Sequence, residues 1–348
     1  MMPVPSPLRL RLDSSALVAN WRWLRAKGGA AICGAALKAD GYGLGASGVM
    51  RHLVAAGCRD FFVSNWAEAA ALMPLAADVS LSVLHGVSDS DMAAARALPV
   101  RPVLCSVDQV ARWRAGGDGR PCDVMVDTGM NRLGLRPDEA MGGALDGLAI
   151  DTLLSHLVSA DEESDLTARQ LAAFHRLRAA IPARRYSLSN SAGVCLGADY
   201  GFDLTRPGIA LYGGVPRAEA AGQIRQVVFP EGRVLQLRTV PAGETVGYGA
   251  SWAARSDVRV AVVNMGYADG YLRCHAGSGG ARWGDICLPL IGRVSMDLIA
   301  FDASAAPGLA EGDWLAVDYD LPGTAAKSGL SQYELLTGLG ARFDRQWI

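Results

Sequence analysis

The chain repeats one pair of structural elements eight times within its first 222 residues, and this repetition limits its possible folds more than any other feature. Short apolar runs of strand length alternate with longer stretches that have helical periodicity. The strand-like runs are residues 30–37, 61–64, 81–85, 102–106, 123–127, 152–156, 185–189 and 204–206. Eight such units are the number required for a (β/α)8 barrel, a fold of typically ~250 residues. A doubly wound open sheet is the structural alternative.

The pattern changes after Gly214. From residue 226 onward, short alternating or apolar runs are broken by Gly, Pro and Asp, which is typical of an all-β domain. The clearest helical pattern in this part is residues 331–339. We therefore expect a barrel domain over residues 1–222 and a β domain over residues 223–348. It stays open whether the first strand, about residues 8–12, pairs with the β domain.

Composition and charge exclude several classes of protein. The net charge is −2, and no basic block suggests nucleic-acid binding. No apolar run is long enough for a transmembrane helix, and the N-terminus lacks the apolar segment of a signal peptide. The seven cysteines are scattered and form no Cys-x-x-Cys pair. We therefore expect a cytoplasmic protein without a metal site, a membrane segment or a nucleic-acid partner.

Lys38 is the leading candidate for chemistry. It follows the first barrel strand and precedes a loop with three glycines, Gly41, Gly43 and Gly45. The chain has only three lysines, at positions 27, 38 and 327, against thirty arginines. A lysine amine can form a Schiff base with an aldehyde, whereas arginine cannot. The alternative is an ordinary solvated cation, but the strand end, the glycines and the scarcity of lysine favour a chemical role.

Further candidates lie at the ends of later strands, where (β/α)8 barrels place their active sites. They are Arg132 after the fifth strand, His156 at the end of the sixth, Asn190 and Ser191 after the seventh, and Arg206, Gly208 and Ile209 after the eighth. The last two loops of a barrel often bind phosphate through backbone N–H groups and a hydroxyl. Taken singly, these residues could also be a buried histidine, a helix cap or a surface cation. Together with Lys38, they suggest pyridoxal phosphate held as a Schiff base.

The full set of motifs closely resembles the alanine racemase family, from about Leu8 to Ile348. The matching segments, in the family's order, are residues 37–43, 127–132, 155–157, 190–192, 206–213, 266–271 and 292–297. The resemblance implies pyridoxal 5'-phosphate as cofactor, an N-terminal (β/α)8 barrel and a C-terminal β domain. It also implies a homodimer whose active sites are shared between subunits.

The resemblance also implies a role for each matching residue. Lys38 holds the cofactor and acts as one of two bases, and Tyr267 of the partner subunit is the base on the opposite face. Arg132 binds the substrate carboxylate, assisted by the backbone of Met296 of the partner subunit. The residues around the cofactor are Tyr42, Ser191, Gly208 and Ile209 at the phosphate, with Asn190 beside them, His156 against the pyridine ring and Arg206 at the ring nitrogen.

Two positions depart from the family pattern. Many members have a lysine, often carbamylated, where this chain has Met125, and many have a phosphate-binding tyrosine where it has Ala341. A thioether is only a weak hydrogen-bond acceptor. We therefore expect Arg132 to be held by Asp127, by an amide such as that of Asn131, or by a bound anion such as chloride.

The expected function is interconversion of L-alanine and D-alanine by a cytoplasmic homodimer, with the D form used for peptidoglycan. One alternative is the same type of racemase acting on serine or on a longer amino acid. A second is a non-catalytic pyridoxal-phosphate carrier, although a carrier needs neither Tyr267 nor a second domain. A third is a Schiff-base aldolase that uses the phosphate loops for its substrate.

Overall fold

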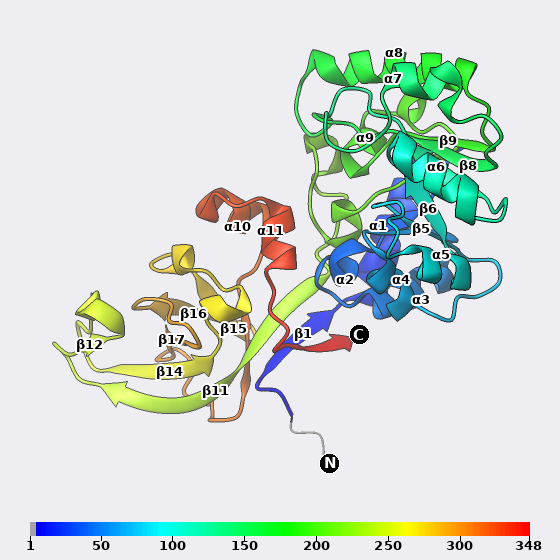
Figure 1. Ribbon diagram of the computed structural model, residues 1–348. Coiled ribbons are helices and arrows are strands. Elements are labelled where there is room, and N and C mark those ends of the chain that lie inside the picture. The colour runs from blue at the N-terminus through cyan, green and yellow to red at the C-terminus, as the bar shows by residue number, and fades with distance from the viewer. Residues whose placement is uncertain (1–4) are drawn as a thin grey trace. The chain divides into compact units, whose positions relative to one another are not determined.

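The computed structural model describes residues 5–348, which divide into two compact units (Figure 1). One unit is continuous, Ala16–Arg225, and the other combines Gln226–Ile348 with the N-terminal residues up to Ser15. The division thus lies at 225/226, three residues beyond the expected 222/223, and the N-terminal strand groups with the later unit. No helix among the described residues is long and apolar enough to cross a membrane.

The unit Ala16–Arg225 contains a parallel sheet whose strands follow one another in chain order. Its strands are β3 (Ala35–Ala36), β4 (Asp60–Val63), β5 (Ser80–Val83), β6 (Arg101–Leu104), β7 (Cys122–Met125), β8 (Ile150–Leu154) and β9 (Arg185–Ser187). These strands are buried on both faces and therefore read as continuous apolar runs. Each matches one of the runs expected from the sequence.

The sheet closes through two further strands, β2 (Ile32–Cys33) and β10 (Leu204–Thr205), which pair in parallel. The N–H of Arg206 donates to the carbonyl of Ser189 at 2.9 Å, which joins the last strand to the preceding one. Gly34 separates β2 from β3, and a Cβ there would lie 2.8 Å from the carbonyl oxygen of Asp60. The predicted (β/α)8 barrel is confirmed.

Helices connect the barrel strands and begin with side-chain caps at several positions. Ser106 caps α6 and Ser164 caps α8, each accepting a hydrogen bond from a backbone N–H of the first turn. The helices are α1 (Ser14–Lys27), α2 (Lys38–Tyr42), α3 (Ala46–Ala56), α4 (Trp66–Ala71), α5 (Met92–Ala97), α6 (Val107–Gly116), α7 (Pro137–Glu139), α8 (Asp165–Ala180) and α9 (Ser191–Cys195).

A glycine spacing that follows β3 and runs into α3 would alone favour the open-sheet alternative. Gly43, Gly45 and Gly48 form a Gly-x-Gly-x-x-Gly pattern after the first strand, as in dinucleotide-binding folds. The closed barrel shows that this spacing has a different origin here. Gly43 ends α2 in the left-handed region, at φ 84°, and Gly45 precedes α3 at φ 92°.

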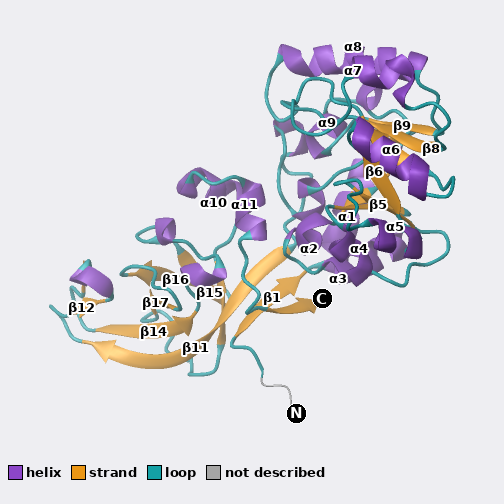
Figure 2. Ribbon diagram, in the orientation of Figure 1, coloured by secondary structure: helices purple, strands orange, loops and turns teal. Residues whose placement is uncertain are grey.

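The other unit is built on an antiparallel sheet (Figure 2). Its longest strand, β11 (Val228–Val240), pairs with strands on both sides and carries an irregularity between Val234 and Gln236. The other strands of the unit are β1 (Leu8–Leu12), β12 (Thr245–Val246), β13 (Trp252–Ala253), β14 (Val258–Asn264), β15 (Gly280–Trp283), β16 (Ile286–Ile291), β17 (Leu298–Asp302), β18 (Trp314–Val317) and β19 (Asp344–Trp347). The expected β domain is thereby confirmed, with β1 antiparallel to β11 and parallel to β19.

Two helices lie near the C-terminus, α10 (Leu321–Ser328) and α11 (Gln332–Thr337). The second was expected from the sequence, but the first was missed. Its start, Leu321-Pro322-Gly323, resembles a turn, yet proline is favoured in the first turn of a helix. Asp320 completes the start by accepting a hydrogen bond from the N–H of Gly323 at 2.7 Å.

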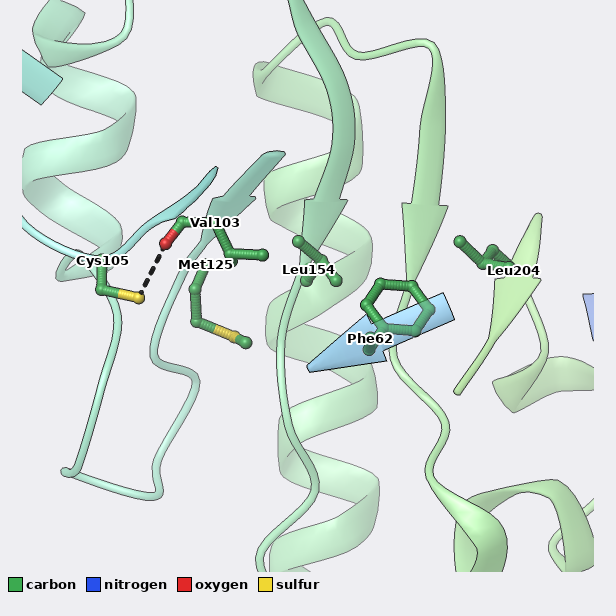
Figure 3. Close-up of a cluster of buried hydrophobic side chains, with 6 residues drawn as sticks. All are labelled: Phe62, Val103, Cys105, Met125, Leu154 and Leu204. Atoms are coloured by element: carbon green, nitrogen blue, oxygen red, sulfur yellow. Dashed lines mark hydrogen bonds between the residues drawn. The ribbon is translucent and has the colours of Figure 1, made fainter. Parts of the chain in front are cut away.

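An apolar cluster occupies the barrel interior (Figure 3). Five of its members lie on five different strands, and the sixth, Cys105, directly follows β6. The members are Phe62, Val103, Cys105, Met125, Leu154 and Leu204. Figure 3 shows these side chains turned toward a shared interior. Met125, one of the two positions expected to depart from the family pattern, is therefore part of an apolar core.

Charged side chains lie at the N-terminal ends of several barrel strands. Arg185 is buried and donates to Asp60 and to Asp151, both at 2.8 Å. Burial tends to raise the pKa of Asp151, but Arg184, Arg101 and Arg185 outweigh it and lower that pKa to about 2. The stability contributed by this carboxylate is therefore present at neutral pH. It is lost as the pH falls below ~4, the ordinary value, and through about 2.

Breaking this buried network should destabilise the barrel far more than breaking an exposed pair elsewhere in the same unit. Arg185→Met leaves two buried carboxylates without their shared partner, and we expect a loss of ~3–5 kcal/mol in the free energy of unfolding. Arg136→Met is the control, because Arg136 and Asp138 are both mostly exposed and their solvent-screened pair should contribute little to stability. Denaturant unfolding of both variants measures the difference. Equal losses would contradict this account.

Candidate active site

Lys38 begins a single left-handed helical turn at the C-terminal end of the first barrel strand. Ala39, Asp40, Gly41 and Tyr42 have φ values of 54°, 52°, 63° and 56°. The N–H of Gly41 donates to the carbonyl of Leu37 at 2.7 Å. Because a left-handed conformation costs ~1–2 kcal/mol for each residue with a Cβ, surrounding contacts must hold this turn in place.

Two carboxylates supply those contacts. Glu68, on α4, accepts a hydrogen bond from the N–H of Ala39 at 2.9 Å and another from the N–H of Ser64 at 2.7 Å. Asp40 accepts from the N–H of Ala46, at the start of α3, at 2.8 Å. The backbone on the C-terminal side of Lys38 is therefore tied to the next βα unit and to the following helix.

The amine of Lys38 is shifted toward its neutral form. Burial lowers the pKa of Lys38 and the charge of Arg132 lowers it further, while Glu68 acts in the opposite direction and Arg206 again lowers it. A larger fraction of this amine is therefore neutral near pH 7 than for an ordinary lysine. That is the property required of a Schiff-base nucleophile.

Arg206 lies buried at the end of the last barrel strand. Its guanidinium donates to the carbonyl of Ser155 at 2.5 Å and to the hydroxyl of Ser187. Within residues 5–348 no carboxylate forms an ion pair with it. Burial lowers the pKa of Arg206 to about 10, and Asp123 counteracts this in part. Arg206 therefore remains a cation at neutral pH.

His156 is the fourth side chain of this group, with Lys38, Arg132 and Arg206. Burial, followed by the charges of Arg206, Lys38 and Arg132, lowers the pKa of His156 to about 3. The imidazole is therefore neutral at pH 7 and can pack against an aromatic ligand without adding charge. These four side chains come from the C-terminal ends of barrel strands or from the loops that follow them. Their excess of positive charge suits an anionic ligand.

A second group of residues forms a cradle at the ends of the last two strands. The hydroxyl of Ser191 accepts hydrogen bonds from the N–H groups of Gly208 at 2.9 Å and Ala210 at 3.3 Å. A Cβ at Gly208 would lie 2.1 Å from the hydroxyl of Tyr42, whose ring stacks on Tyr212 at 4.6 Å. Two hydroxyls and a glycine backbone thus meet at one place, where the 3₁₀ helix η3 (Ile209–Tyr212) begins.

Asn190 has a local structural role in this cradle. Its side-chain oxygen accepts a hydrogen bond from the N–H of Gly193 at 2.9 Å and so caps α9. The helix cap was one of the two interpretations of Asn190 that the sequence left open. It places Ser191 as the first helical residue, with its side chain turned toward Gly208.

Arg132 follows a loop that is organised by Asp127. The carboxylate of Asp127 accepts from the N–H groups of Gly129 at 2.7 Å, Met130 at 2.8 Å and Arg132 at 3.0 Å. Asp127 therefore holds the backbone of Arg132. Arg132 also lines a cavity of about 530 Å³, whose lining does not include Lys38, His156 or Arg206. Of the acceptors expected for the Arg132 side chain, Asp127 is already occupied by the backbone.

Tyr267 and Met296 lie together in the β unit. The N–H of Tyr267 donates to the carbonyl of Ser295 at 3.0 Å, and the N–H of Ala268 donates to the carbonyl of Met296 at 3.1 Å. The Arg273 guanidinium lies 5.1 Å from the centre of the Tyr267 ring. The structure therefore brings these two predicted residues onto adjacent loops of one unit, whereas the other predicted site residues belong to the barrel unit.

Comparison with known protein families covers both units. Residues 12–216 match the model of the alanine racemase N-terminal domain, and residues 227–347 match the model of the C-terminal domain. The chain belongs to the alanine racemase family. The resemblance inferred from the sequence motifs is thereby confirmed.

Several relatives match over nearly the full chain. An alanine racemase from Methylobacterium nodulans is 44% identical, covering 98% of this chain and 96% of the relative. A catabolic alanine racemase from Agrobacterium fabrum is 41% identical, covering 97% and 92%. The crystal structure of alanine racemase from Bartonella henselae with covalently bound pyridoxal phosphate has a TM-score of 0.87 and 33% identity, covering 99% and 100%.

Other side chains that hold the site were missed by sequence reasoning. Gln170, buried in the middle of α8, donates to the carbonyl of His156 at 2.8 Å and to the hydroxyl of Thr128 at 3.1 Å. Thr128 in turn bonds the hydroxyl of Ser155 at 2.7 Å, and the backbone carbonyl of Ser155 accepts from Arg206. A glutamine on the apolar face of a helix was the available signal, because a buried polar group requires partners.

Removing the charge of Arg132 should raise the pKa of Lys38. In Arg132→Gln, the pH midpoint for acylation of Lys38 by acetic anhydride should move upward, because a nearby positive charge no longer disfavours the protonated amine. Peptide mass spectrometry across a pH series measures the midpoint for Lys38 alone. Arg136→Gln is the control, since Arg136 is exposed and pairs with Asp138. A midpoint that is unchanged in Arg132→Gln, or equally shifted in both variants, would show that Arg132 does not act on Lys38.

Proposed function

We propose that this protein is a pyridoxal-phosphate-dependent alanine racemase. The observation that carries the proposal is the combination of Lys38, whose pKa is lowered, with the cations Arg132 and Arg206, next to a cradle of hydroxyls and backbone N–H groups. Membership of the alanine racemase family supports the same activity. A cofactor that combines an aldehyde, an aromatic ring and a phosphate matches each of these features.

The residues present fit this cofactor. Ser191, Gly208, Ile209 and Tyr42 would hold the phosphate, because their hydroxyls and backbone N–H groups converge at the start of η3. The neutral ring of His156 would lie against the pyridine. Lys38 would hold the cofactor covalently, and Asn190 would keep Ser191 in place through its helix cap. When bound, pyridoxal phosphate withdraws electrons from the substrate Cα and so acidifies its proton.

Racemisation requires a proton to leave one face of Cα and another to arrive on the opposite face. In our proposal the amine of Lys38 handles the proton on one face. The phenolic oxygen of the partner subunit's Tyr267 handles it on the other. Arg206 remains protonated at neutral pH, since its pKa of about 10 is well above 7, and so it orients the pyridine nitrogen without giving up its proton.

Arg132 and the backbone of Met296 of the partner subunit would bind the substrate carboxylate. The alignment of this carboxylate fixes Cα between the two bases. Asp127 contributes by holding the backbone of Arg132, which leaves the guanidinium available. We also propose a cytoplasmic homodimer with shared active sites and a role in supplying D-alanine to peptidoglycan.

Reduction with borohydride and a substrate panel test the cofactor and the substrate together. With added pyridoxal phosphate, reduction should label Lys38 rather than Lys27 or Lys327. Alanine should have the highest kcat/KM, with serine lower by ~10–200-fold, because a small pocket discriminates by size to about this extent. Bound cofactor without racemisation would instead indicate a carrier. Failure to bind the cofactor would indicate a Schiff-base aldolase, and faster turnover of a longer amino acid would overturn the choice of substrate.

Subunit mixing tests whether the sites are shared. Lys38→Ala and Tyr267→Phe chains should each be nearly inactive, but a heterodimer would contain one site with both bases intact. Random exchange should then restore about a quarter of wild-type activity, since half the dimers are mixed and each has one working site. Mixing Lys38→Ala with Arg206→Gln is the control, because both changes lie in the barrel unit and no intact site forms. The shared-site model fails if mass spectrometry confirms exchange but activity does not return.

A further inference from the structure

Arg342 joins two loops of the β unit that carry proposed site residues. It lies between α11 and β19, directly after Ala341. Its Nε and Nη2 donate to the two carboxylate oxygens of Asp269 at 2.7 and 2.8 Å. Its Nη1 donates to Asp297 at 2.7 Å. One guanidinium thus binds two carboxylates from different loops.

Each carboxylate is close in sequence to a proposed site residue. Asp269 closes the 3₁₀ turn η6 (Tyr267–Asp269), and it also accepts a hydrogen bond from the N–H of Gly266 at 3.0 Å. Asp297 directly follows Met296. Arg342 therefore ties the loop that carries the proposed base to the loop whose backbone would bind the substrate carboxylate.

The two loops are also in direct contact, so a small displacement of one loop would move the other. A Cβ at Gly266 would lie 2.2 Å from the carbonyl oxygen of Met296, which leaves no room for a side chain between the loops. Asp269 is fully buried, so its carboxylate depends on Arg342 for charge compensation. The planar guanidinium also fixes the relative orientation of the two carboxylates, because one edge bonds Asp269 and the remaining nitrogen bonds Asp297.

We propose that Arg342 is a positioning residue for racemisation, which sets the geometry between Tyr267 and Met296. The inference rests on the proposed function, because it assigns Arg342 a role at that same site. Displacement of a catalytic group by about 1 Å can reduce turnover by ~10²-fold. Arg342 acts through Asp269 and Asp297 and does not touch the substrate.

Holoenzyme variants separate positioning from stability. Arg342→Met should lower kcat by ~10–100-fold at a temperature well below its unfolding midpoint, as expected for a displaced base. Arg342→Lys should recover only part of the loss, since an ammonium cannot bond both edges. The control is Arg259→Met, because Arg259 holds the carbonyls of Ala306 and Leu309 in the same unit but no proposed site residue. Its kcat should stay within twofold of wild type.

The isotope effect with α-deuterated alanine gives a readout that loss of stability would not produce. In Arg342→Met, the effect should rise in the direction of racemisation in which Tyr267 removes the proton, and it should not rise in the other direction, in which Tyr267 returns a proton. Asp297→Asn should raise KM for alanine with little change in thermal stability, because Asp297 is half exposed. This second variant tests the Met296 loop even if Arg342→Met does not fold.

The outcomes distinguish this inference from the proposed function. Wild-type kcat with unchanged isotope effects in Arg342→Lys, and an unchanged KM in Asp297→Asn, would overturn the positioning role while leaving racemisation intact. Equal losses of kcat in Arg342→Met and Arg259→Met would also overturn it. Absence of racemisation in the wild-type holoenzyme would overturn the proposed function itself.

Discussion

The chemistry of the barrel mouth depends on one buried cation. Arg206 is removed from water and bonded to a serine hydroxyl and a backbone carbonyl, and no carboxylate among the described residues pairs with it. Its charge lowers the pKa of His156 and contributes to lowering that of Lys38. An ion pair at Arg206 would cancel this effect. The hydrogen bonds through Ser155, Thr128 and Gln170 therefore hold the guanidinium of Arg206 in place without neutralising its charge.

The sequence predicted the fold well because its barrel strands are continuous apolar runs, a pattern that does not depend on distant partners. The strand ends, in turn, located Lys38, His156 and Arg206. The left-handed turn after Lys38 could not be predicted in the same way. Only its glycines were visible, whereas Ala39 and Asp40 adopt that conformation because Glu68 and Ala46 bind them from other elements. Gln170 was missed for the same reason, since its partners lie on two different loops.

Met125 and Arg132 show how packing and backbone hydrogen bonds contribute separately to this part of the site. The side chain of Met125 joins the apolar cluster with Phe62 and Leu154, so this position contributes packing rather than a polar contact. Asp127 then determines the loop by accepting three backbone hydrogen bonds. The backbone of Arg132 is consequently held by Asp127, and a side-chain partner of Arg132 is not needed to form the loop.

The pairing of β1 between β11 and β19 places the two ends of the chain on neighbouring strands. Translation from the N-terminus completes the barrel unit, which is continuous in sequence, before either partner of β1 has been made. β1 must therefore wait through the synthesis of more than two hundred residues for β11, and β19 is the last strand to emerge. At ~5–20 residues per second, an apolar strand edge is exposed on the ribosome for tens of seconds. The two arginines of β1, Arg9 and Arg11, interrupt its apolar sequence and so reduce the risk of association with other nascent chains during that interval.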